Sequence, residues 1–231
     1  MDAIDKIVSN DWKDELQLPN VKTTFVAHGT IEIDVVYTND ILQVEETLKI
    51  LRCKQRKQEA YEEFMGLDFE YTKDEKDKQH VAVVQLCMDR IVLVWQLSRP
   101  KERCEALFNW FRQRFSKFAS VYIRGDMKVM ERTWGFTIPF RYHVDIQDIY
   151  HIRGRGEMTG MAALAGELID SSYGEMKDNF PKDGHDFREK RPLDEVNVKY
   201  VVVDGFVAFE LYRRLQCILK GLLVLQPKPK A

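Results

Sequence analysis

The sequence predicts an α/β fold in which helices flank a mixed central β-sheet. Short runs rich in β-branched residues alternate with longer segments that have a helical spacing of apolar residues. Three of the strand-like runs follow one another with short links, which favours antiparallel neighbours. Hydrophobic residues make up 45% of the 231 residues, which is enough to bury a substantial core.

The N-terminal part is predicted to form a hairpin followed by a helix. Residues 1–20 are polar, and we expect them to be an extension. β-Branched runs at 22–27 and 31–37 flank a turn that contains Gly29, as in a β-hairpin. Thr38-Asn39-Asp40 can then cap a helix that runs to about Gln58.

Three consecutive strands are predicted in the middle of the chain. They cover residues 64–70, 80–88 and 90–97, and Asp89 is the expected turn residue between the last two. The charged segment 72–79 reads as a solvated connector between the first two. Consecutive strands with such short links indicate an antiparallel meander.

The second half is predicted to alternate helices with short extended segments. In chain order these are a helix at 101–117, a strand at 119–123, a helix from Gly125-Asp126 to about Gly135, an extended segment at 140–149, a helix at 158–169, a polar loop at 171–191 and a long helix from Pro192 to about Leu223. The tail 224–231 is too rich in proline and lysine to pack. We expect a single domain, although a boundary near residue 60 would divide the chain in two.

The composition excludes several classes of protein. Lysine and arginine (35) nearly balance aspartate and glutamate (37), which argues against coating duplex DNA by bulk charge. The four cysteines are far apart and form no CxxC pair, so free thiols in a reducing compartment are expected. The chain has neither a secretory signal pattern nor the roughly 20 apolar residues of a membrane span. A cytoplasmic or nuclear protein without a membrane partner is therefore predicted.

Two acids lie two positions apart on the first of the three central strands. Alternation along a strand puts Asp68 and Glu70 on one face, while Leu67 and Phe69 point into apolar surroundings. Two carboxylates on one face repel each other unless a cation bridges them. The alternative is a strand with one wetted face.

Two further positions carry acids in apolar settings. Tyr200 and Asp204 lie one turn apart on the same face of the predicted C-terminal helix, which is apolar nearly all round. Asp126 follows Gly125 at a junction from strand to helix. Asp204 could simply be a hydrogen-bonded core acid, and Asp126 could simply be a helix N-cap.

The order of these motifs resembles that of a known family. D-x-E on a strand, an aspartate at a later strand end and Y-x3-D on a later helix are similar to the DEDDy subgroup of 3′–5′ exonucleases, which have the ribonuclease-H-like (DnaQ-like) fold. The likeness is greatest to the Werner-syndrome-type exonuclease domain, in particular to its small single-domain plant relatives. Residues 81–87, 92–97 and Arg191-Pro192-Leu193 also match the family.

The resemblance implies a role for each of these residues. Asp68 would bridge two divalent cations, either Mg²⁺ or Mn²⁺. Glu70 and Asp204 would complete the first metal site, and Asp126 would serve the second. Tyr200 would orient the attacking water.

The same resemblance suggests the substrate contacts. Tyr71 stands where relatives often have tryptophan and could stack on a terminal base. Tyr71 and Leu67 are the candidate substrate-binding residues. His185-Asp186-Phe187 stands where relatives often carry a tryptophan. Both departures bear on substrate preference and leave the metal ligands unchanged.

The function implied is that of a metal-dependent 3′–5′ exonuclease that releases nucleoside 5′-monophosphates from single-stranded nucleic acid, with RNA favoured over DNA. The exonuclease domain would cover 21–223, with a leader hairpin and helix at 21–60 and a catalytic core at 61–223. The plant relatives further suggest a homo-oligomeric ring and RNA-silencing factors as partners. The alternative is a catalytically weak or inactive scaffold with the same fold, which binds nucleic acid or protein.

Overall fold

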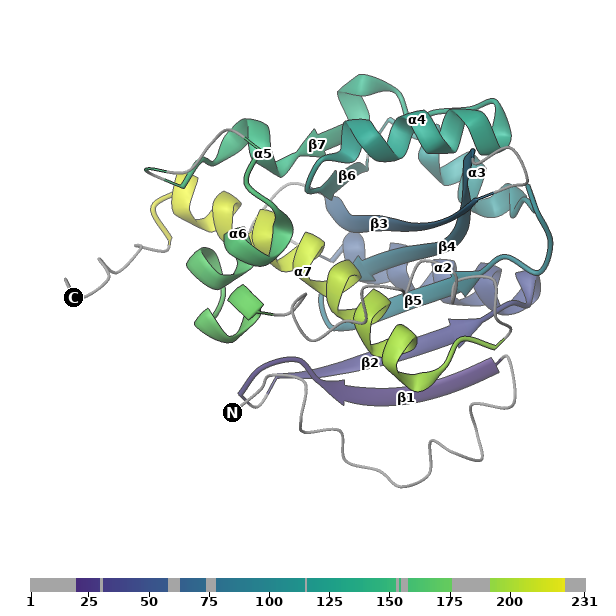
Figure 1. Cartoon of the computed structure of the whole chain (residues 1–231), viewed down its shortest axis with the longest axis horizontal. Coiled ribbons are helices and arrows are strands. Elements are labelled where there is room, and N and C mark those ends of the chain that lie inside the picture. Colours follow the sequence, from purple (N-terminus) through teal and green to yellow (C-terminus); the bar gives the residue numbers. More distant parts are fainter. Residues whose placement is uncertain are drawn as a thin grey trace.

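A seven-stranded mixed β-sheet forms the centre of the molecule (Figure 1). The computed structural model describes residues 20–29, 31–57, 63–73, 78–114, 116–152, 154, 158–175 and 192–222. In spatial order the strands are β1 (Asn20–Val26), β2 (Glu32–Thr38), β5 (Ile91–Gln96), β4 (Gln79–Met88), β3 (Phe64–Lys73), β6 (Lys117–Ser120) and β7 (His143–Asp145). The predicted mixed α/β fold is confirmed.

The N-terminal hairpin is part of this sheet. β1 pairs with β2 antiparallel, as predicted, and β2 continues into the sheet by pairing parallel to β5, with Asp34 opposite Ile91. The predicted meander is also confirmed, because β3, β4 and β5 pair antiparallel in turn. Asp89 makes the tight turn between β4 and β5 with a φ of 55°. β6 and β7 then add parallel strands beside β3.

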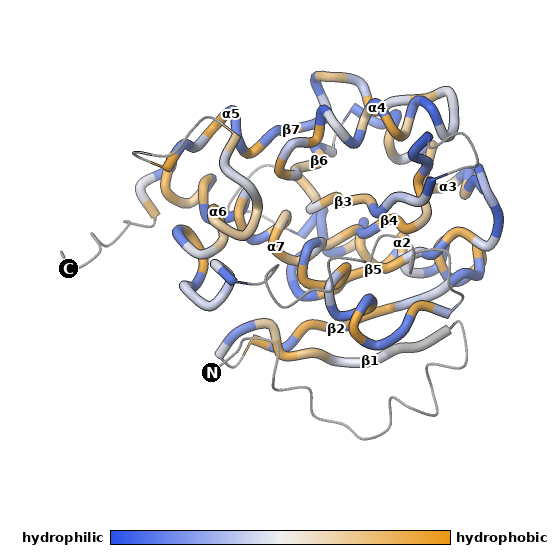
Figure 2. Tube along the Cα trace, viewed as in Figure 1, coloured by the Kyte–Doolittle hydropathy of each residue, from blue (hydrophilic) through white to orange (hydrophobic). Residues whose placement is uncertain are grey.

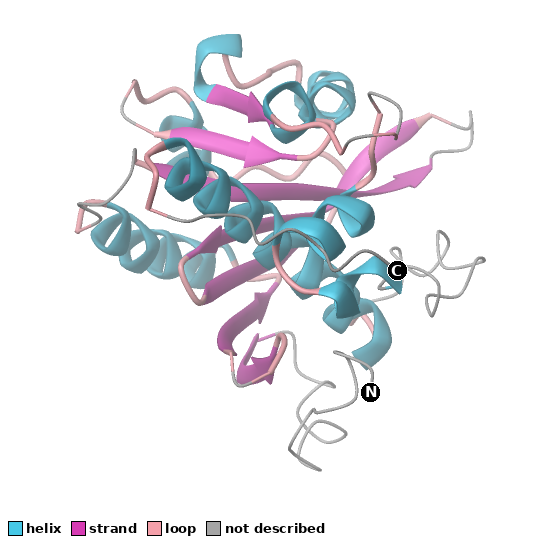
Figure 3. Ribbon diagram, turned by 90° about the vertical axis from the view of Figure 1, so that its left-hand side faces the viewer, coloured by secondary structure: helices cyan, strands magenta, loops and turns pink. Residues whose placement is uncertain are grey.

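Two long helices lie on opposite faces of the sheet, as the views in Figures 1 and 3 show together. α2 (Ile41–Gln55) is capped by Asp40, whose side chain accepts a hydrogen bond from the Leu42 N–H. α7 (Glu195–Leu219) is capped by Asp194, which accepts from the Asn197 N–H. Both caps satisfy N–H groups that the first helical turn leaves without partners. Both helices were predicted.

The helix predicted at 101–117 is much shorter in the structure. α3 covers only Glu105–Phe111, because Lys101 has a positive φ of 62° and Glu102 accepts a hydrogen bond from the Ser98 N–H across a turn. Lys117, at the other end, already belongs to β6. Local turn chemistry therefore prevails over the apolar stripe that suggested a longer helix.

The strand predicted at 119–123 ends earlier than expected. β6 stops at Ser120 because the Tyr122 N–H donates to Asp145 and Tyr122 takes a left-handed φ of 63°. α4 (Ile123–Trp134) begins directly after it and ends at Gly135, the predicted C-cap, also with a φ of 63°. The early start places Asp126 inside the first turn of α4.

The remaining segments are shorter than the sequence suggested. The stretch predicted as extended at 140–149 contains a 3-10 helix, η1 (Phe140–Tyr142), then β7 and α5 (Ile146–Ile149). The helix predicted at 158–169 is α6 (Met161–Leu168), and η2 (Ser171–Glu175) opens the predicted loop. The predicted extension up to residue 19, the rest of that loop with His185-Asp186-Phe187 and Arg191, and the tail lie outside the described residues.

The apolar core lies where the sheet meets its helices, and Figure 2 shows hydrophobic residues along β4, β5 and α7. None of the helices among the described residues is long and apolar enough to cross a bilayer. All four cysteines are free thiols, as predicted. Phe64 of β3 stacks on Phe209 of α7, with ring centroids 4.9 Å apart, and meets Tyr212 edge-on at 4.7 Å. These contacts hold α7 against the strand that carries the first two acids.

Candidate metal centre

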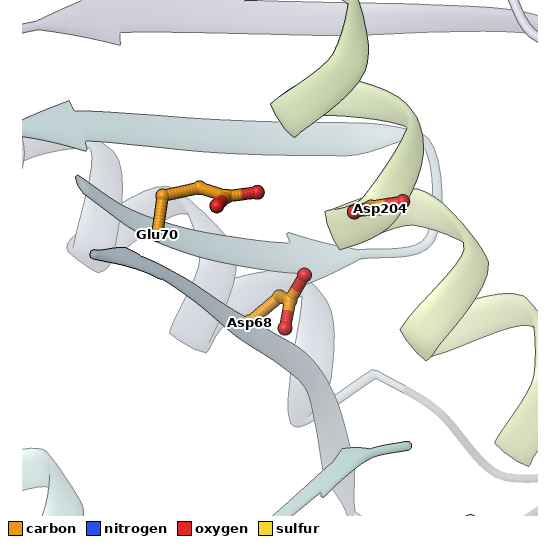
Figure 4. A group of neighbouring side chains, drawn as sticks. All are labelled: Asp68, Glu70 and Asp204. Carbon is orange, nitrogen blue, oxygen red and sulfur yellow. The ribbon is translucent and has the colours of Figure 1, made fainter. Parts of the chain in front are cut away.

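The first two acids project from one face of β3. Glu70 is buried and Asp68 is half-buried, while Leu67 and Phe69 on the opposite face are fully enclosed by the core. Figure 4 shows the Asp68 and Glu70 carboxylates extending toward α7. The alternation expected of a strand is therefore present at this position.

The third acid comes from α7 and completes a compact group. Asp204 is 1% exposed, and its carboxylate faces the two carboxylates of β3 (Figure 4). One oxygen from each of Asp68, Glu70 and Asp204 lies within 4.8 Å of the other two. Residues distant in the sequence thus meet at one point between a strand and a helix.

Two glycines allow α7 to approach the sheet this closely. A Cβ at Gly66 would lie 2.5 Å from the backbone N of Phe209 and 2.8 Å from the carbonyl oxygen of Gly205. A Cβ at Gly205 would lie 3.0 Å from the Cβ of Gln85. The two backbones pack at a distance that no larger residue permits at Gly66. The separation of Asp204 from Asp68 and Glu70 depends on this contact.

Gln85 is a polar residue beside the acids that was not among the predicted site residues. It lies directly opposite Asp68 in the pairing of β3 with β4, so the two side chains share a face of the sheet. Gln85 is fully buried, and neither atom of its amide has a hydrogen-bond partner among the described residues. The available signal was a single amide within the apolar run of β4.

The fourth acid lies next to the group without joining it. Asp126 is in the first turn of α4 and is 7% exposed, and its Oδ1 accepts a hydrogen bond from the Tyr71 hydroxyl. Among the described residues, the group of mutually close ligand atoms contains only the other three acids. Asp126 does not cap α4, because the N-cap position belongs to Tyr122. The capping alternative is therefore wrong.

The surroundings of Asp126 raise the pKa of its carboxyl group. Burial raises the pKa of Asp126 to about 8; the Tyr71 hydroxyl lowers it, and the charges of Glu70 and Asp145 raise it. Burial, together with the neighbouring Asp126, raises the pKa of Tyr71 far above its ordinary value. The hydroxyl of Tyr71 is therefore a hydrogen-bond donor at every ordinary pH.

The remaining predicted site residues, Tyr200, Tyr71 and Leu67, differ in how exposed their side chains are. Tyr200 is half-buried on α7, one turn before Asp204, and packs against the core. Tyr71 is half-buried, and its hydroxyl is engaged with Asp126. Leu67 is 0% exposed and offers no surface to a substrate, which argues against the predicted contact.

The donor set fits divalent cations that prefer oxygen. All the acids of the centre present carboxylate oxygens, and Asp126 has a second oxygen, Oδ2, that is buried and has no hydrogen-bond partner among the described residues. Three carboxylates this close repel one another unless protons or cations neutralise them. Oxygen-only ligation favours Mg²⁺ or Mn²⁺ over zinc.

A separate cavity of about 310 Å³ lies elsewhere on the molecule. It lies between the β1–β2 turn, the β4–β5 turn and α7, and its lining includes His28, Arg90, Glu210, Arg213 and Arg214. Arg213 and Arg214 both donate to the Glu210 carboxylate, and Arg214 also donates to a backbone carbonyl. The cavity includes none of the selected acids, and its main cationic groups are already engaged.

Comparisons with known proteins identify the fold. Neither a protein-family model nor a curated protein sequence matches the chain. Among solved structures, RNase D of Escherichia coli, described as an exoribonuclease involved in structured RNA processing, aligns with a TM-score of 0.57 and 15% identity over 76% of this chain. The Nibbler EXO domain of Aedes aegypti aligns with a TM-score of 0.59 and 14% identity over 78% of this chain and 87% of its own.

A third solved structure was determined with metal. NrnC of Brucella melitensis with bound Mg²⁺ aligns with a TM-score of 0.52 and 17% identity over 70% of this chain and 76% of its own. The same protein was also solved bound to pGG. The chain spans 44% of the length of RNase D, so the likeness to that protein covers less than half of it. At these identities the comparisons establish the fold alone, which this chain shares with RNase D, the Nibbler EXO domain and NrnC.

Proposed function

We propose that this protein is a metal-dependent 3′–5′ exonuclease of the DEDDy type, which hydrolyses single-stranded nucleic acid from the 3′ end to nucleoside 5′-monophosphates. The observation that carries the proposal is the convergence of Asp68, Glu70 and Asp204 to within 4.8 Å. This convergence occurs on a fold shared with RNase D and with an NrnC that binds Mg²⁺. The order of the motifs, similar to that of the Werner-type family, supports the same function.

Each residue of the centre has a distinct task in this proposal. When bound, two divalent cations would lower the pKa of a water and neutralise charge on the leaving oxygen. Asp68 would bridge the two sites, Glu70 and Asp204 would hold the first, and Asp126 would serve the second. Tyr200 would hydrogen-bond the attacking water and fix its direction.

RNA is the substrate that we favour over DNA. RNase D is described as an exoribonuclease, and NrnC was solved with pGG, which supports a nucleic-acid substrate for this fold. The near-neutral net charge of −2 suits short single strands better than duplexes. We include the ring of Tyr71 as a stacking surface for a terminal base and leave Leu67 out because it is buried. Digestion of RNA and DNA of matched sequence tests the preference.

The wider organisation of the protein is part of the same proposal. We expect the exonuclease domain to cover 21–223, with its catalytic core at 61–223, in a ring of identical subunits located in the cytoplasm or nucleus. RNA-silencing factors are the partners that the plant relatives suggest. Light scattering after size-exclusion chromatography measures the subunit count, and limited proteolysis locates the domain limits. A monomeric mass in both dilute and concentrated samples would remove the ring from the proposal.

The decisive experiment uses one oligonucleotide labelled at either end. With Mg²⁺ or Mn²⁺, a 5′ label should yield a ladder of progressively shorter products, while a 3′ label should be released at once as a mononucleotide. Chelation should stop both reactions, as should Asp68→Asn and Asp204→Asn. Asp148→Asn is the matched control, because Asp148 is an exposed acid that pairs with Arg124. Cleavage that survives Asp68→Asn would exclude this centre as its source.

The position of Asp126 outside the group of three acids favours one alternative function, that of a catalytically weak or inactive scaffold. Its carboxylate is engaged by Tyr71 and lies outside the group of three acids. A scaffold would retain the oligonucleotide intact in the presence of either cation. Gel-shift binding without laddering would therefore support the scaffold over the enzyme.

A further inference from the structure

Gln85 occupies an otherwise apolar face of β4. Its neighbours on that face of the strand, Val83 and Cys87, are 0% exposed. Gln85 is itself 0% exposed, and neither its Oε1 nor its Nε2 has a hydrogen-bond partner among the described residues. An amide in this state costs free energy that an apolar side chain of the same size would not. This unmet hydrogen-bonding capacity indicates a partner that the folded chain by itself does not supply.

The residues around Gln85 leave its amide one polar neighbour across the sheet. β5 places Val94 directly opposite Gln85 on one side, and β3 places Asp68 directly opposite on the other. The Cβ atoms of such a pair lie about 4.5–5.5 Å apart, which is within reach of a glutamine side chain. A Cβ at Gly205 of α7 would lie 3.0 Å from the Cβ of Gln85 and 3.8 Å from its Cγ. Gln85 therefore lies beside Asp68 and against the turn of α7 that carries Asp204.

The chemistry of an amide suits a place beside a carboxylate that binds a cation. The NH₂ group donates hydrogen bonds, and such donation favours the ionised form of a carboxylate. The amide oxygen accepts hydrogen bonds, and Mg²⁺ held by a few carboxylates keeps several waters that can donate. An amide also adds no charge to three acids that already repel one another. Both ends of the Gln85 amide would therefore gain partners when the centre holds a cation.

We propose, on the basis of the proposed function, that Gln85 is a positioning residue for the metal centre, whose Nε2 donates to the Asp68 carboxylate and holds it in the orientation that binds the cation. The Oε1 accepts from a water bound to the same cation. Residues that orient metal ligands in this way commonly contribute about tenfold to a hundredfold to metal affinity. In the metal-free protein the same amide lacks these partners and lowers stability. Gln85 thus has effects of opposite sign on metal affinity and on the stability of the metal-free fold.

Gln85→Met tests the proposal by two measurements that should change in opposite directions. Methionine is unbranched and of similar length but has no N–H donor, so Mn²⁺ should bind about tenfold to a hundredfold more weakly. The melting temperature of the metal-free protein should rise by roughly 2–4 °C, because the buried amide is gone. Calorimetric titration with Mn²⁺ gives the affinity, and scanning calorimetry in chelator gives the melting temperature. Gln85→Leu is a second variant that removes the amide with a different side-chain shape.

Nuclear magnetic resonance of the wild-type protein observes the amide directly. In ¹⁵N-labelled protein, Mg²⁺ should shift the side-chain NH₂ resonances of Gln85, because the group then donates to a carboxylate. Gln55 of α2 is the matched control, since it is also a buried amide whose Nε2 has no partner among the described residues, while its Oε1 accepts from the Ser116 hydroxyl. Its NH₂ resonances should not move with Mg²⁺. Gln55→Met should lower stability and leave Mn²⁺ affinity unchanged.

The outcomes separate this inference from the function on which it rests. Wild-type Mn²⁺ affinity in Gln85→Met and Gln85→Leu would overturn the inference and leave the nuclease proposal standing. A loss of affinity without a Mg²⁺-dependent shift of the Gln85 resonances would also overturn it, because the variants would then act through packing. If neither variant folds, the wild-type resonances decide. Absence of Mn²⁺ binding by the wild-type protein would instead refute the metal centre, and the role of Gln85 with it.

Discussion

Substituting Gly66 with alanine should separate the acids of the centre without altering any of them. The added Cβ would lie 2.5 Å from the backbone N of Phe209 and 2.7 Å from its Cβ, whereas ordinary contact begins at 3.4 Å. The clash is with the helix backbone, which cannot rotate away as a flexible side chain would. α7 must therefore move from β3 by roughly 1 Å to restore van der Waals contact.

This displacement should have two measurable consequences. Overpacking in a core typically costs about 1–3 kcal/mol in the free energy of unfolding, and we expect Gly66→Ala to fall in that range. Asp204 moves with α7, and an error of about 1 Å at a reacting centre can cost on the order of 100-fold in rate. Urea unfolding measures the first effect, and Mn²⁺ titration with oligonucleotide cleavage measures the second.

A matched glycine provides the control. Gly174, in η2, has nothing within 4 Å of an added Cβ and no positive φ, so Gly174→Ala should leave metal binding unchanged and should not lower stability. Wild-type stability together with wild-type Mn²⁺ affinity in Gly66→Ala would refute the argument. Such a result would mean that the close approach of α7 to β3 does not determine the centre.

Three further predictions concern polar groups that are buried or half-buried. Gln85→Leu should stabilise the metal-free protein by about 1 kcal/mol, because it removes a buried amide that has no hydrogen-bond partner in the described part of the chain, and an unaltered or lower midpoint in thermal melting would contradict this. Asp204→Asn should abolish the rise in melting temperature that Mn²⁺ gives the wild-type protein, since a ligand stabilises the folded state that binds it; a full rise in the variant would place the cation elsewhere. Burial lowers the pKa of His28 below 6.5 in the folded state. The unfolded chain then binds more protons, so stability should be full above pH 6.5 and fall as the pH drops below it. Chemical denaturation at several pH values should show a shallower loss in His28→Gln, and equal slopes would exclude His28 as a source.

Much of the architecture follows from short-range signals. The caps Asp40 and Asp194 begin helices because their side chains satisfy the first free N–H groups, and this chemistry acts within three residues. Strand alternation likewise places Asp68 and Glu70 on one face of β3, whatever tertiary contacts the strand makes. These features could be predicted because each depends on neighbours along the chain.

Predictions failed where a competing contact came from elsewhere or from turn chemistry. The apolar stripe at 101–117 suggested a helix of that length, but a turn closed by Glu102 delays the start of α3 and the pairing of β6 with β3 takes up Lys117. The strand before Asp126 ended early because Asp145, on another strand, binds the Tyr122 N–H. Periodicity carries no information about such partners.

The sequence by itself determined which side chains could form an acidic centre and on which kind of element each would lie. Tertiary structure alone decided that Asp68, Glu70 and Asp204 meet, that Gln85 lies beside them, and that the Tyr71 hydroxyl donates to Asp126. The physical reason is the sequence distance over which each interaction acts. Helix caps and strand alternation depend on residues a few positions apart. The contacts between these side chains depend instead on how closely α7 and α4 pack against the sheet, and the whole core determines that packing.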